Sequence, residues 1–150
     1  MKKFIFSLQK VLEIREQILE NSKIELSNLN HDYRNIELGI KNLNDKFYSV
    51  NNEFLEKSAV AVSVGEMSYY KIYLNSILKQ VENKEEEKEN LFKKIEAKRQ
   101  EIVNKKMEIS SLEKLRENEY EKYNSAMAKS EEIFIEEFVS NKSMTKRYAI

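Results

Sequence analysis

Apolar side chains recur along the first third of the chain at spacings that alternate between three and four residues. This is the heptad pattern of a coiled-coil helix, in which two positions of every seven, a and d, face a partner helix. The a positions are Leu12, Leu19, Leu26, Tyr33, Ile40, Phe47 and Phe54, and the d positions are Leu8, Arg15, Ser22, Leu29, Ile36, Leu43 and Val50. Two polar residues, Arg15 and Ser22, interrupt this stripe. The pattern predicts a first helix over about residues 8–57.

A second stripe of the same period occupies the rest of the chain. Its a positions include Met67, Leu74, Val81, Ile95, Ile102 and Ile109, and its d positions include Tyr70, Ile77, Leu91 and Leu112. Four lysines dilute it, namely Lys84, Lys88, Lys98 and Lys105. The stripe predicts a second, longer helix over about residues 64–140, followed by a tail over residues 141–150.

The segment between the two stripes, residues 58–63, lacks a helical period and is expected to be an extended connector. Ser63 and Glu66 form an S-x-x-E capping box, which predicts that the second helix starts at Val64. Ser7 is the expected cap of the first helix, with Phe6 and Val11 as its hydrophobic staple.

One connector between two stripes predicts an antiparallel hairpin. If the turn is centred near Ala61 or Val62, the numbers of facing residues sum to about 124, so that Leu43 faces Val81 and Leu26 faces Lys98. In this register each polar stripe residue faces an apolar one, over which a long charged side chain can lay its methylene groups. The sequence therefore predicts an all-α protein: a single coiled-coil domain over residues 1–150, folded as a long two-helix antiparallel hairpin whose second helix is longer.

Composition narrows the possible functions. The chain has no proline, no cysteine and two glycines, which excludes folds rich in tight turns and sites that need thiolates. Lys and Arg number 26, as do Asp and Glu, so no net charge favours binding to nucleic acid. No apolar run is long enough for a signal-peptide core or for the roughly 20 residues of a membrane span. We therefore expect a cytoplasmic protein with protein partners, and neither nucleic-acid binding nor membrane insertion.

No enzyme site is expected from this sequence. His31 is the single histidine, and with Asp32 it falls on the solvent side of the first helix, where a two-helix hairpin has no pocket. Gly39 and Gly65 are too few for a phosphate-binding loop. We expect no catalytic residue, metal ion, cofactor or small-molecule ligand. The acidic run at residues 85–89 is interpreted as a solvated helix face rather than a contact site.

Two groups of apolar side chains lie outside the stripes and are candidate partner-binding surfaces. Near the turn they are Tyr69, Ile72 and Tyr73, together with the neighbouring stripe residue Tyr70. At the opposite end they are Phe4, Val11, Ile14 and Ile18 of the first helix and Tyr120, Tyr123, Met127, Phe134 and Phe138 of the second, for which the hairpin leaves no covering segment. Ordinary surface aromatics and local packing are the alternative interpretations.

The chain resembles the family of the flagellar export protein FliJ. The resemblance rests on the opening from Phe6 to Leu12 followed by Arg15 and Glu16, on Glu66, Met67, Tyr70, Tyr73 and Leu74, and on the run from Leu112 to Glu117. It implies a cytoplasmic hairpin similar to the gamma stalk of rotary ATP synthases. It also implies that the terminal end binds the hexameric export ATPase FliI, that the body contacts the export gate protein FlhA, and that the protein assists export chaperones. Two alternatives stay open: a stalk of a virulence type III secretion system, and a homo-oligomeric coiled-coil scaffold.

Overall fold

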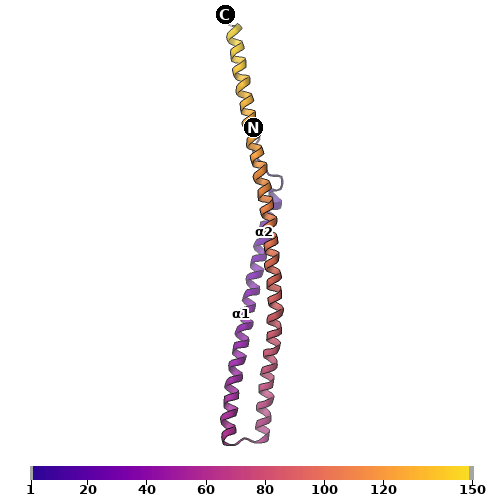
Figure 1. Cartoon of the computed structure of the whole chain (residues 1–150), viewed down its shortest axis with the longest axis vertical. Coiled ribbons are helices and arrows are strands. Elements are labelled where there is room, and N and C mark those ends of the chain that lie inside the picture. Colours follow the sequence, from indigo (N-terminus) through magenta and orange to yellow (C-terminus); the bar gives the residue numbers. More distant parts are fainter. Residues whose placement is uncertain (1, 149–150) are drawn as a thin grey trace. The chain divides into compact units, whose positions relative to one another are not determined.

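The computed structural model of the protein describes residues 2–148, with side chains through residue 145. It contains two helices, α1 over Gln9–Val60 and α2 over Val64–Tyr148. Figure 1 shows the two helices joined by a short turn and running side by side in opposite directions. The predicted fold class is confirmed: an all-α antiparallel hairpin in which α2, with 85 residues, is longer than α1, with 52.

The chain divides into two compact units, which we describe separately. One unit combines the chain up to Leu19 with the chain from Asn104 onward, and the other comprises Glu20–Val103. The turn and most of the paired length of the hairpin lie in the second unit. The expectation of one coiled-coil domain over the whole chain stays a prediction.

The heptad stripes form the buried seam within each unit. All predicted seam positions of α1 except Arg15 are buried or half-buried, and so are those of α2 except Met67. Ile77 is the most enclosed side chain, with 2 % of its surface exposed. Ser22, a polar interruption of the stripe, is 3 % exposed, because a small side chain fits a position that the facing helix covers. Burial of these apolar side chains is the main stabilising term of the hairpin.

Contacts across the seam follow the predicted register of about 124. The rings of Phe54 and Tyr70 lie 5.2 Å apart, and the ammonium group of Lys98 pairs with Glu25 at 2.6 Å. Arg15 forms an ion pair with Glu108 in the unit that contains the chain termini. In both units the facing residues therefore have the expected numbers, to within a turn of helix.

The lysines of the second stripe keep their charges at the edge of the seam, as the sequence predicts. Lys98 bonds Glu101 at 2.8 Å in addition to Glu25. Hydrogen bonds that the Lys98 ammonium donates to Glu101 and, next in effect, to Glu25 raise the pKa of Lys98 above its ordinary value. The Lys88 ammonium lies 5.5 Å from the ring centroid of Tyr33, a cation–π contact. These lysines cover apolar neighbours and remain paired.

The start of α2 is set by the predicted cap. The Glu66 backbone N–H donates to Ser63 Oγ at 3.1 Å, and the Met67 N–H donates to the Ser63 carbonyl at 3.0 Å. The Ser63 hydroxyl therefore satisfies one of the donors that a helix leaves free at its first turn, while its carbonyl accepts the first regular helical bond. Residues 61–63 form the whole connector between the helices.

Other helix ends differ from the sequence-based boundaries. Helix α1 continues to Val60, where the Ser58 hydroxyl donates to the Phe54 carbonyl at 2.7 Å and no glycine or proline interrupts it. It begins at Gln9, with the Leu8 carbonyl accepting the first helical bond, so Leu8 occupies the cap position assigned to Ser7. The predicted tail is also corrected: α2 continues through residues 141–148, which were expected to lie outside the helix.

The register predicts which residue pairs can be cross-linked. Since the chain has no cysteine, Leu43→Cys combined with Val81→Cys should form an intramolecular disulfide under mild oxidation. Leu43→Cys combined with Leu74→Cys is the matched control and should stay reduced, because these residues lie seven positions out of register. Mass spectrometry of the monomer band distinguishes the two. Efficient bridging in the control, or bridging only between chains, would refute the register.

The cap makes a second prediction. Ser63→Ala should lower the free energy of unfolding by about 1 kcal/mol, because it removes the acceptor of the Glu66 N–H. Hydrogen exchange should become faster at residues 64–67, while Ser63→Asp, which retains a capping oxygen, should stay close to the wild type. Unchanged exchange in Ser63→Ala would show that another group caps α2.

Candidate partner-binding surfaces

The predicted turn-end surface lies on α2 in the unit Glu20–Val103. Tyr69 is 66 % exposed and Ile72 is 71 % exposed, whereas Tyr73 is half-buried. The rings of Tyr69 and Tyr73 stack with centroids 6.3 Å apart and planes at 6°. The Lys46 ammonium of α1 lies 5.5 Å from the Tyr73 ring centroid. The three side chains thus form one exposed apolar surface, which we call the turn surface.

Tyr70, which sequence analysis placed in this surface, belongs to the seam. It is 7 % exposed, packs against Phe54, and donates its hydroxyl to Glu53 at 3.1 Å. The interaction of Lys57 with the Tyr70 hydroxyl is the largest cause that raises the pKa of Lys57. Tyr70 therefore holds the first turns of the hairpin together and offers no surface to a partner.

The second predicted surface lies in the unit that contains the chain termini, and part of it is covered. The residues before α1 form a non-helical arm, residues 2–8, that packs on α2. The Phe4 ring contacts Tyr120 at 5.1 Å and Tyr123 at 5.5 Å, and the Tyr123 hydroxyl donates to the Lys2 carbonyl. The expectations that Phe4 belongs to a helical stripe and that no segment covers these tyrosines are wrong, since the arm continues the pairing beyond the start of α1.

The arm leaves the later part of α2 uncovered. Tyr123 and Met127 are half-buried, but Phe134 and Phe138 are 70 % and 56 % exposed. Four further large apolar residues of this stretch, which were not singled out from the sequence, are also exposed: Ile133, Ile135, Val139 and Met144. All side chains from residue 128 to residue 145 are exposed.

On α1 the remaining predicted residues of this end are at the surface. Val11 is 39 % exposed, Ile14 59 % and Ile18 42 %. We call these three residues together with Phe134 and Phe138 the terminal surface, although in the predicted register the two groups lie about 30 Å or more apart along the helices. Exposed apolar side chains are candidate contact sites for other proteins.

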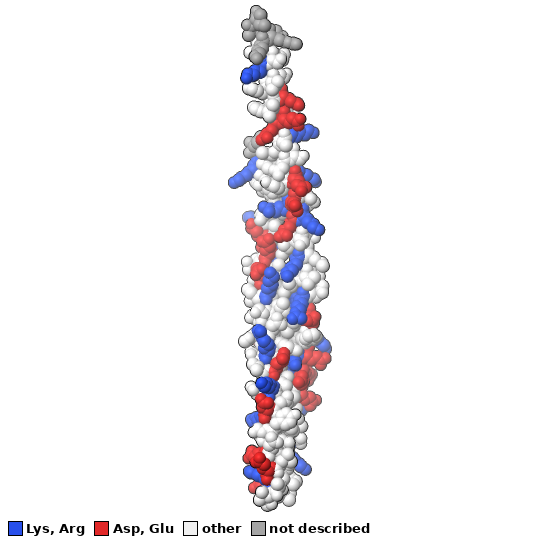
Figure 2. All heavy atoms as spheres, turned by 60° about the vertical axis from the view of Figure 1, so that its left-hand side comes forward, with Lys and Arg blue, Asp and Glu red and all other residues white. Residues whose placement is uncertain are grey.

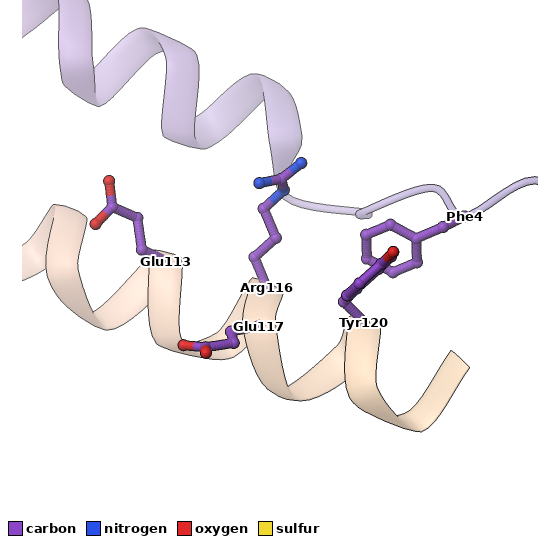
Figure 3. Close-up of a pocket in the computed structure, with 5 residues that line it drawn as sticks. All are labelled: Phe4, Glu113, Arg116, Glu117 and Tyr120. Carbon is purple, nitrogen blue, oxygen red and sulfur yellow. The ribbon is translucent and has the colours of Figure 1, made fainter. Parts of the chain in front are cut away.

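A pocket of about 440 Å³ lies where the arm meets α2. It is lined by Phe4, Glu113, Arg116, Glu117 and Tyr120. Figure 3 shows the Phe4 ring standing beside Tyr120, with the Arg116 side chain extending from α2 toward the start of α1. This pocket was not predicted from the sequence. It could have been predicted from the hairpin register, which pairs Phe4 with Tyr120 when the register is continued to the residues before α1.

No metal-binding group was found among residues 2–148: no three His, Asp or Glu side chains there come together to hold an ion. His31 is exposed, as predicted. Within the same described part of the chain, neither helix is long and apolar enough to cross a membrane. Figure 2 shows acidic and basic side chains interspersed over the visible face.

The fold and its surfaces define a class of protein, the antiparallel coiled-coil hairpin. Within this class, the sequence model described as "Flagellar FliJ protein" matches residues 4–147, nearly the whole chain. The chain therefore belongs to the FliJ family, a family of non-catalytic components of flagellar export. Searches of curated proteins and of solved structures returned no match.

The arm contact predicts the effect of one substitution. Phe4→Ala removes both ring contacts with Tyr120 and Tyr123, so the first residues of the arm should loosen while the buried Phe6 stays in place, and the free energy of unfolding should fall by about 1 kcal/mol. Hydrogen exchange at residues 9–12 should become faster, because the turn that leads into α1 is held less firmly. Ile5→Ala is the matched control: Ile5 is 82 % exposed, and its loss should change nothing. Equal exchange in both variants would contradict a docked arm.

Proposed function

We propose that the protein is a non-enzymatic stalk or adaptor of the flagellar type III export apparatus. In this role it couples the hexameric export ATPase FliI to the export gate protein FlhA and assists export chaperones, on the cytoplasmic side of the flagellar basal body. The family match over residues 4–147 carries the proposal and favours a flagellar over a virulence secretion system.

The distribution of exposed apolar side chains supports a protein with two binding sites. The turn surface and the terminal surface lie in different compact units, and Tyr69, Ile72, Phe134 and Phe138 are each more than half exposed. Because the side chains at the heptad positions already fill the seam between the helices, these exposed side chains can be buried only by contact with another protein. We assign the ATPase to the terminal surface and the gate protein to the turn surface.

The proposal is tested with two double variants of the full chain. Tyr69→Ala with Ile72→Ala should weaken binding to the FlhA cytoplasmic domain, since an anchoring aromatic contributes about 2 kcal/mol or roughly 30-fold in affinity. Stimulation of FliI ATPase activity should remain. Phe134→Ala with Phe138→Ala should have the opposite effects, and both variants should reduce motility.

A matched control separates binding from folding. Leu38→Ala with Leu55→Ala removes two side chains that are each 56 % exposed but lie outside both surfaces, and it should retain both interactions. Circular dichroism checks that helicity is unchanged in every variant. If each double variant lost both interactions, a single extended interface would replace the two-surface proposal. If neither lost any, the two surfaces would not be the binding sites.

A further inference from the structure

One side of the unit Glu20–Val103 places like charges opposite each other. Lys23, Asn30 and Glu37 follow each other at heptad spacing on α1, and Glu85, Phe92 and Arg99 do so on α2. The register pairs them across the hairpin as Lys23 with Arg99, Asn30 with Phe92 and Glu37 with Glu85. We call these six residues the like-charge face.

Contacts in the structure support the pairing of the basic layer, while that of the acidic layer follows from the register. Lys23, Asn30 and Arg99 line one shallow hollow of about 530 Å³, so the two cations of the first layer lie on the same side. The ion pair of Lys98 with Glu25 fixes the register beside them. Phe92, in the middle layer, is 50 % exposed.

In a single hairpin this arrangement is unfavourable. Residues that flank a coiled-coil seam usually carry opposite charges across it, whereas here one layer is basic and the other acidic. Lys23 pairs only within its helix, with Glu20 at 3.2 Å, and Arg99 pairs in the same way with Glu96 at 2.8 Å. Such exposed pairs contribute little. Lys41 and Lys88 line a hollow together with Glu37 of the acidic layer, but neither forms an ion pair with it there, and the Lys88 ammonium lies over the Tyr33 ring.

The same arrangement is complementary to itself. Both charged layers lie seven residues from the Phe92 layer, about 10 Å along the helices. A two-fold axis that crosses the hairpin at the Phe92 layer superposes the basic layer of one copy on the acidic layer of the other. Lys23 then meets Glu37 of the second copy and Arg99 meets Glu85 of the second copy, each twice by symmetry.

The same two-fold axis sets the contacts at the centre and at the rim of the arrangement. At the centre the two Phe92 rings cover each other, which places an aromatic pair on the axis. At the rim, Lys41 meets Glu20 of the second copy while Glu89 meets Glu96 of the second copy. One contact is attractive and the other repulsive, so the four central ion pairs and the Phe92 pair decide the association.

We propose that the like-charge face is a homodimerisation surface, on which a second copy of this chain docks antiparallel. Between the rim residues Glu20 and Lys41 the contact is about 32 Å long, and two helices of about 11 Å width each then offer at most about 700 Å² per copy. This is slightly less than the roughly 800 Å² per partner of a standard interface. The dimer is therefore weak and sensitive to salt. This inference goes beyond the proposed function and uses neither the turn surface nor the terminal surface.

Charge reversal tests the proposal by sedimentation equilibrium of the full chain. The wild type should dimerise at about 0.05 M salt and dissociate at about 0.5 M. An acidic variant, Lys23→Glu with Arg99→Glu, should dimerise at least about tenfold more weakly, and so should a basic variant, Glu37→Lys with Glu85→Lys. An equimolar mixture of the two should form a heterodimer, since all four ion pairs are then present, two with the original sign and two with reversed sign.

Further variants define the result that would overturn the proposal. Phe92→Ala should weaken the dimer, whereas Phe134→Ala with Phe138→Ala should not. A wild type that stays monomeric at high concentration, or a mixture of the charge variants that stays monomeric, would refute it. So would a dimer that is lost only in the Phe134 and Phe138 variant. Binding of a glutamate-rich peptide to a monomeric wild type would show that the basic layer serves another acidic partner.

Discussion

The structure depends on one constraint: a two-helix hairpin has a single seam, so each helix can bury only one stripe of side chains. Every other position must be polar, exposed or covered from outside the helix pair. This explains why lysines are tolerated within the second stripe. Lys98 and Lys88 place their methylene groups over the neighbouring helix and keep their charges at glutamates or an aromatic ring. A larger core would have excluded them.

Much of the fold could be predicted from the sequence because its determinants are local or periodic. The register followed from the length of the connector and the phase of two stripes, and the contact between Phe54 and Tyr70 agrees with it. The start of α2 followed from Ser63, whose hydroxyl can be assigned without knowledge of tertiary structure. The ends of α1 and the end of α2 were less predictable, because nothing in those segments terminates a helix and propensity alone decides how far it continues.

The candidate surfaces were predictable only in part. Heptad position separates Tyr69 from the seam and assigns Tyr70 to it, and the structure follows heptad position rather than proximity in sequence. The docked arm was missed because Phe4 lies seven residues before Val11, so the helical period was continued into residues 2–8, which are not helical. Its partner could still have been found by extending the register, since Phe4 and Tyr120 lie where the hairpin places facing residues.

The seam also limits what the remaining side chains can mean. A sequence selected only for the stability of a lone hairpin would place opposite charges across the like-charge face and polar residues at Phe92 and Phe134. The seam does not need these residues, since the side chains at the heptad positions of both helices already enclose it. Local choices that conflict with the stability of the isolated fold are expected where a protein meets another molecule. We therefore propose one physical explanation for the exposed aromatics and the like-charge layers: each destabilises the single hairpin, and contact with another protein chain would offset this cost.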